Sequence, residues 1–123
     1  MRGYLIGIGM LAALATPAMA AEVVAGDYDC VAQKHGVEIP VGLLTIRDEV
    51  FIGPRSIDNL NAPEHAFELL DNNTIIWPQA FLDNTIPGAE IIQAWSDPQD
   101  YVIYTELADP DGDAVTIYCL YAP

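Results

Sequence analysis

The segment of this chain with the most evident chemical potential is Asp-Pro-Asp-Gly-Asp, in which Asp109, Asp111 and Asp113 place three carboxylates at alternate positions. This spacing is typical of the start of an EF-hand calcium loop, which also requires glycine at its sixth position and a bidentate glutamate at its twelfth. Here Gly112 is fourth, and the twelfth position counted from Asp109 is Leu120. The mismatch favours a hairpin turn over a calcium site. We therefore predict no metal and no cofactor, with calcium at the three aspartates as the alternative.

Groups suited to catalysis are scarce. The chain has two serines, Ser56 and Ser96, two histidines, His35 and His65, and a single lysine, Lys34. Neither serine stands in the Gly-x-Ser-x-Gly context of a hydrolase nucleophile. The histidines lie in polar settings that are typical of solvated loops. The sequence therefore predicts a protein that is not an enzyme.

Two cysteines, Cys30 and Cys119, stand near the two ends of the segment 21–123. Around each of them the residues alternate in polarity, and the cysteine falls on the face that looks buried, with Tyr28 in one segment and Ile117 in the other. A redox-active pair would need Cys-x-x-Cys spacing, which these two residues lack. We predict a structural disulfide that closes a long loop and contributes about 4–5 kcal/mol to stability.

Residues 1–20 have the features of a secretory signal peptide. One positive charge precedes an uncharged apolar run at 4–15, and Ala18 and Ala20 supply the small side chains of a cleavage site. The run is too short to cross a bilayer, which takes about 20 helical residues. We predict a single exported domain over 21–123, periplasmic or extracellular, with no stable membrane anchor after signal cleavage.

The charge balance is strongly acidic. The whole chain has 4 basic and 18 acidic residues and a formal charge of −14; the segment 21–123 keeps three of the basic and all of the acidic residues, hence −15. Three cations cannot neutralise a phosphate backbone, so nucleic-acid binding is excluded. A hydrophobic fraction of 52% argues against a disordered acidic tail. A folded domain of this charge attracts cationic proteins and peptides.

Short segments of alternating polarity, separated by turns, predict an all-β domain. We expect about eight strands, with turn residues at 71–73, 87–88, 97–98 and 109–112 between them. The segment 62–70 is ambiguous, because a polar cap and helical spacing also fit a short helix there. The expected strands cover residues 26–32, 42–47, 49–53, 66–70, 74–77, 89–95, 101–107 and 114–121.

These strands suit a small antiparallel meander that forms a closed or nearly closed barrel. Pairing of the first and last strands would place Cys30 beside Cys119 and remove exposed sheet edges. The alternative arrangement is a two-sheet β-sandwich. In the barrel, we predict that the disulfide links the paired terminal strands.

The last hairpin offers a candidate recognition surface. A register centred on its Asp-Pro-Asp-Gly turn brings five side chains of the last two strands onto one outward face. Aromatic residues ringed by charge are typical of recognition surfaces. The alternative is that the segment 54–65 covers this face, which would then be core. The five predicted partner-binding residues are Val102, Tyr104, Glu106, Tyr118 and Leu120.

We interpret the chain as a non-catalytic exported binding domain that captures a cationic protein or peptide through an acidic, tyrosine-containing surface. An inhibitor is one form that such a domain takes. The alternative is a small lipocalin-like carrier, because the interior of an eight-stranded barrel can hold one apolar ligand. Trp77, Trp95, Phe51 and Phe67 would then line the cavity, although aromatic side chains in so short a chain also serve to fill a core.

Overall fold

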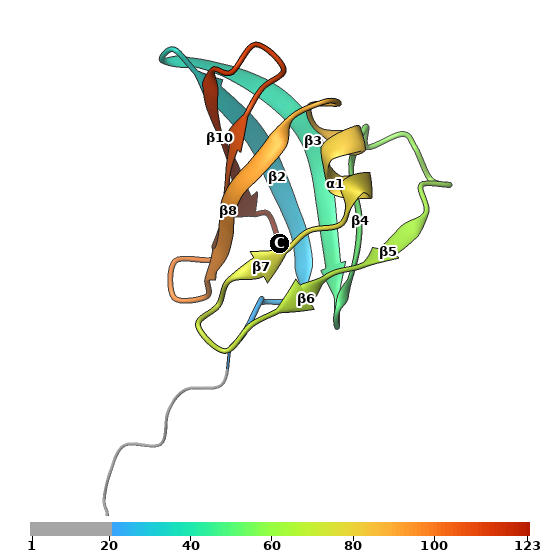
Figure 1. The fold of residues 1–123 in the computed structure, drawn as a ribbon. Coiled ribbons are helices and arrows are strands. Elements are labelled where there is room, and N and C mark those ends of the chain that lie inside the picture. The colour runs from blue at the N-terminus through green and yellow to red at the C-terminus, as the bar shows by residue number, and fades with distance from the viewer. Residues whose placement is uncertain (1–20) are drawn as a thin grey trace, which may run out of the picture.

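The computed structural model describes residues 21–123, so the predicted signal peptide lies outside the described residues. The described chain folds into antiparallel strands and one short helix (Figure 1). In chain order the elements are β2 (Gly26–Lys34), β3 (Val37–Arg47), β4 (Val50–Arg55), β5 (Glu64–Ala66), β6 (Glu68–Leu69), β7 (Ile75–Ile76), α1 (Gln79–Asn84), β8 (Glu90–Asp97), β9 (Val102–Ala108) and β10 (Ala114–Tyr121).

Seven of the strands form one antiparallel sheet in the order β5-β4-β3-β2-β10-β9-β8. Figure 1 shows this sheet curling into a half-barrel, with α1 and the small β6–β7 hairpin on its concave side. Each strand presents alternate side chains to the two sides of the sheet, as the period-two pattern of the sequence requires. The predicted all-β antiparallel architecture is therefore confirmed.

The first and last long strands, β2 and β10, are neighbours, as predicted. Cys30 stands opposite Cys119 in their register, with the two Cα atoms 4.0 Å apart, and their sulfurs form a disulfide. Both cysteines are buried on the concave side. The linked pair lies in the middle of the sheet, whose edges are β5 and β8. Since β5 and β8 do not pair with each other, the sheet keeps two edges and is a half-barrel and not a closed barrel.

The disulfide indicates an oxidising, non-cytoplasmic compartment, because the cytosol keeps most thiols reduced. Within the described part of the chain, no helix has the length and apolar character needed to cross a membrane. Export itself depends on residues 1–20 and stays a prediction.

Aromatic side chains fill the concave side. The Trp77 ring stacks on Phe81 with centroids 4.2 Å apart, while Phe51 and Phe67 lie edge-on or tilted against it. The indole N–H of Trp77 donates to Thr105 Oγ1 at 3.0 Å, which satisfies its only polar atom. All four rings are at most 6% exposed, so they form the centre of the core.

The ambiguous segment 62–70 forms the strands β5 and β6, and the turn at 71–73 leads into β7, which pairs with β6. The strand interpretation of this segment is thus confirmed. The helix lies further along the chain, at Gln79–Asn84, where none was expected from the sequence. It has only six residues, begins after Pro78 and is anchored by Phe81 and Leu82. A helix this short is unstable in isolation, so packing and not local sequence determines it.

Candidate functional site

The side of the sheet opposite the core, called here the outer face, is built from alternate residues of β2, β8, β9 and β10. In β9, Ile103 and Thr105 are buried on the concave side, so Tyr104 between them points outward. The strand registers align Trp95 of β8 with Tyr104 and Tyr104 with Tyr118 of β10. These three side chains, the aromatic row, therefore cross three neighbouring strands at one level.

The geometry of the aromatic row fixes its ring orientations. The rings of Trp95 and Tyr104 are nearly parallel, at 19°, with centroids 5.0 Å apart, and those of Tyr104 and Tyr118 meet edge-to-face at 5.5 Å. The Tyr118 hydroxyl lies 3.3 Å from Gln33 Oε1, to which it donates. All three rings are partly exposed. Stacked and edge-to-face pairs stabilise one another, so the row presents ordered aromatic surface to solvent.

The register predicted for the last hairpin is confirmed. Val102 pairs with Leu120 and Tyr104 with Tyr118, and Glu106 lies on the same side as Tyr104. Leu120 is 49% exposed, and the tyrosines and the glutamate are partly exposed. Val102 is the exception at 9%, because its short side chain lies in an inner strand between longer cross-strand neighbours. The expectation of an exposed Val102 was therefore wrong, while the partner-binding role of the other four stays a prediction.

The segment 54–65 does not cover the aromatic row. It comprises the end of β4, a loop and the start of β5, near the sheet edge opposite β8. Its Ile57 is 74% exposed and borders a hollow of about 410 Å³ together with Asp29, Val31 and Leu43. The loop thus adds an apolar border on the β2–β3 side of the outer face and leaves the row accessible.

The outer face is acidic. Asp97 of β8, Glu106 of β9, and Asp27 and Asp29 of β2 alternate with the inward-facing residues of their strands. The strands β8, β9 and β10 contain no lysine or arginine. Glu106 accepts a hydrogen bond from the neutral amide of Gln93, at 2.7 Å. Asp97 and Glu106 have no cationic partner among the described residues. Arg55, in contrast, donates to the same Thr45 hydroxyl that bonds Asp27, and it lines the same hollow as Asp29. The β8–β9 part of the outer face is therefore attractive to positive charge.

The lysine and the two arginines of the described chain bond to groups outside β8, β9 and β10. Lys34 contacts Asp109 at the end of the half-barrel, and Arg47 of β3 pairs with Glu64 of β5. The Arg55 guanidinium donates to two main-chain carbonyl groups and a threonine hydroxyl between β3 and β4. None of these partners belongs to β8, β9 or β10.

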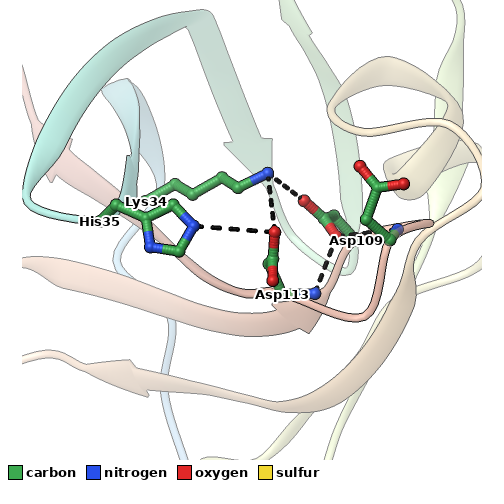
Figure 2. A network of polar contacts seen from close by, with 5 residues as sticks. Lys34, His35, Asp109 and Asp113 are labelled. Carbon is green, nitrogen blue, oxygen red and sulfur yellow. Dashed lines mark hydrogen bonds and ion pairs between the residues drawn. The ribbon is translucent and has the colours of Figure 1, made fainter.

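The acidic turn after β9 is held by a network drawn in Figure 2. Asp109 Oδ1 accepts hydrogen bonds from the backbone N–H groups of Asp111, at 3.0 Å, and Asp113, at 2.9 Å. Asp109 Oδ2 lies 2.5 Å from Lys34 Nζ. The Asp113 carboxylate lies 3.4 Å from the same ammonium and 3.6 Å from His35 Nε2.

This network changes the acidity of its members. The hydrogen bond from Lys34, followed by that from the Asp113 backbone, holds the pKa of Asp109 below its ordinary value. The same bond to Asp109 raises the pKa of Lys34. Both oxygens of Asp109 are thus committed to donors of the protein itself. Within residues 21–123 no group of three or more histidine, cysteine, aspartate or glutamate residues is placed to hold a metal ion.

Trp95 lies on the opposite side of the sheet from the one expected for a cavity-lining residue. The carrier alternative assigned it to the interior, whereas its pairing with Tyr104 puts it on the outer face. Ser96 points inward instead, is 5% exposed, and donates its hydroxyl hydrogen bond to the Glu22 carbonyl at 2.8 Å. A hairpin register across the turn that follows Asp97 would have shown this, because alternation then sets the side of every residue in β8.

Comparison with known proteins gives no family for this chain. No protein-family model matches it, and neither curated proteins nor solved structures provide a match. Function is therefore inferred from the geometry of the outer face.

Proposed function

We propose that this protein is a non-catalytic exported binding domain, which captures a cationic protein or peptide on its outer face. The observation that carries the proposal is the aromatic row, Trp95, Tyr104 and Tyr118, partly exposed on acidic strands without lysine or arginine. An aromatic patch of this kind supplies contact area for a partner, and the surrounding carboxylates favour a partner with positive charge.

The physical basis lies in how aromatic rings and charges act at interfaces. Tyrosine and tryptophan are enriched among the residues that carry most binding energy, because they bury much area at little cost in entropy. Their faces also attract cations. The excess negative charge of the domain raises the encounter rate with a positive partner at low salt. A cationic enzyme held in this way would be inhibited if its active site faced the row.

The carrier alternative gains no support from a specific observation. Phe51, Phe67 and Trp77 pack against one another and against Phe81, so they use the space that an apolar ligand would need. Trp95 lies on the other side of the sheet. The outer face is therefore the better-supported site.

The proposal is tested by binding of the 21–123 protein to a panel of purified proteins with isoelectric points above about 9, with neutral proteins of similar size as controls. We expect binding by basic members that weakens as salt is raised. Tyr104→Ser and Tyr118→Ser should each weaken it roughly tenfold or more, as loss of a tyrosine at the centre of an interface does when that residue carries much of the binding energy.

The matched control is Tyr101→Asn. Tyr101 is 48% exposed, lies outside the row and has a φ of 58°, which asparagine tolerates. Binding by this variant should match that of the unchanged protein. If no basic protein binds, or if all three tyrosine variants bind alike, the outer face is not the recognition surface.

A further inference from the structure

A hollow of about 330 Å³ opens at the β8 edge of the sheet, next to the aromatic row. The residues that line it are Glu22, Asn73, Trp95, Ser96, Asp97, Pro98 and Gln99. The lining thus includes two acidic residues, two residues with side-chain amides and one tryptophan, around a space large enough for one long side chain.

Hydrogen bonds between three separate segments hold the hollow in shape. The backbone N–H of Glu22 donates to Asn73 Oδ1 at 2.9 Å, and its carbonyl accepts from the Ser96 hydroxyl at 2.8 Å. The N–H of Ser96 donates to the Asn73 carbonyl at 2.9 Å. The Tyr28 hydroxyl donates to the Val24 carbonyl and fixes the same N-terminal segment. The hollow is therefore formed before any ligand arrives, which reduces the entropic cost of binding.

The two acidic residues that line the hollow have no lysine or arginine partner in the described part of the chain. Within the described residues neither Glu22 nor Asp97 takes part in an ion pair, since the basic side chains there are engaged at other places. Asp97 Oδ1 accepts one backbone hydrogen bond, from Asp100 at 3.2 Å. Trp95 stacks on Tyr104 and is thereby held at the rim of the hollow. The side chain that suits this setting is flat, positively charged and rich in donors.

We propose that the hollow is a subsite for an arginine side chain of the cationic partner. The inference rests on the proposed function, because the hollow adjoins the aromatic row that would hold the rest of that partner. A guanidinium stacks on indole, donates to carboxylates through a planar fork and is less strongly hydrated than an ammonium, so arginine suits the hollow better than lysine. Glu22 and Asp97 supply the charge, and Trp95 supplies the stacking surface.

The experiment uses Trp95 as the probe of the hollow and Trp77, the other tryptophan of the chain, as the internal control. The ¹⁵N-labelled 21–123 protein is titrated with N-acetyl-arginine amide, and the two indole N–H signals are followed by NMR. We expect the Trp95 signal to move and to saturate, while that of Trp77, buried and bonded to Thr105, stays in place. N-acetyl-citrulline amide, a neutral molecule of the same shape, should move neither signal.

Three variants locate the site. Glu22→Gln and Asp97→Asn should each raise the half-saturating concentration about two- to fivefold, as loss of a partly exposed ion pair does. Both keep their backbone and hydrogen-bonding shape. Asp58→Asn removes the same charge from the exposed loop after β4 and should leave the titration unchanged.

The proposal fails if citrulline moves the Trp95 signal as arginine does, if the three variants titrate alike, or if arginine moves neither signal. It is also wrong in its choice of side chain if N-acetyl-lysine amide binds more tightly than the arginine compound. These failures are distinct from failure of the proposed function. Capture of basic proteins that depends on Tyr104 and Tyr118 could persist without an arginine subsite, and the titration needs no partner protein.

Discussion

The two tryptophans of the chain lie on opposite sides of the same curved sheet and experience different surroundings. Trp77 is 6% exposed, stacks on Phe81 and donates its N–H to Thr105. Trp95 is partly exposed, stacks on Tyr104 and borders a hollow with acidic walls. The number of tryptophans in the sequence therefore does not show which of them fills the core and which lies at the surface. The Trp77 ring is buried and its N–H is hydrogen-bonded, whereas part of the Trp95 ring is accessible to solvent.

The carboxylates divide in the same way. Both oxygens of Asp109 are committed, one to backbone N–H groups and the other to Lys34. Asp97 accepts a single backbone hydrogen bond, and no cation of the described chain pairs with it. The protein thus places its few positive charges at the end of the half-barrel and between β3, β4 and β5. Asp97 and Glu106 on the outer face are left without a cationic partner among the described residues, which is the charge arrangement on which the proposed function rests.

The sharpest way to test the contrast is to remove each indole in turn. Trp77→Ala should lower the free energy of unfolding by about 3–5 kcal/mol, since it leaves a cavity among packed rings and an unpaired Thr105 hydroxyl. Trp95→Ala should cost less than Trp77→Ala, because its ring is partly exposed and its removal leaves a surface depression that water can fill. Urea unfolding of both variants, followed by circular dichroism, measures the difference.

The same two variants should show the reverse order in binding. A Trp95→Ala protein that remains folded should lose affinity for basic proteins. A mild variant of the inner ring, Trp77→Phe, should keep that affinity, because the outer face stays intact. Equal stability losses at the two positions would mean that Trp95 is a core residue and that the outer face is not a free surface.

The second test concerns the link on the concave side between β2 and β10. The double variant Cys30→Ala, Cys119→Ala should lose about 2–5 kcal/mol, because the closed loop spans 89 positions and its loss frees the unfolded chain. Urea unfolding of the variant beside the oxidised protein gives the value. A thiol titration of the folded, non-reduced protein is the companion measurement, and two reactive thiols would contradict the structural role assigned to this bond.

Much of the sheet could be predicted from the sequence because its signals are local. Alternation in the strands around Cys30 and Cys119 fixed which side of each strand is buried, and the Asp-Pro-Asp-Gly turn fixed the register of Tyr104 against Tyr118. Together these placed four of the five predicted outer-face residues at the surface. The prediction for Val102 was wrong because it assumed that every residue on the outer face is exposed, whereas Val102 is covered by its neighbours there.

The rest depended on contacts between distant segments. The helix α1 is six residues long and is held by two buried side chains, so its own sequence carries little signal. The hollow beside Trp95 requires Glu22, Asn73 and Ser96 to meet across gaps of 51 and 74 positions. Composition and periodicity do not indicate which residues that are distant in the sequence form contacts. The candidate recognition face was therefore predictable, while the subsite at its edge was not.

The smallest effect expected concerns the compensated carboxylate, Asp109. Its pKa is lowered in the folded protein, so its contribution to stability is present above the unfolded pKa of about 3.9 and is lost as pH falls through the lowered value. The raised pKa of Lys34 gives a contribution that is present below about pH 10.4 and is lost as pH rises through the raised value. Lys34→Met should therefore destabilise the protein most between these limits, and the difference should fade at both ends.

Thermal unfolding across that pH range measures the profile, and a double-mutant cycle identifies its source. If Lys34 acts through Asp109, then Lys34→Met should have little further effect in an Asp109→Asn protein. Asp97→Asn serves as the contrasting background, because no cation of the described chain pairs with Asp97, and there Lys34→Met should act in full. A loss from Lys34→Met that is equal at all pH values, or equal in both backgrounds, would remove the distinction drawn here between paired and free carboxylates.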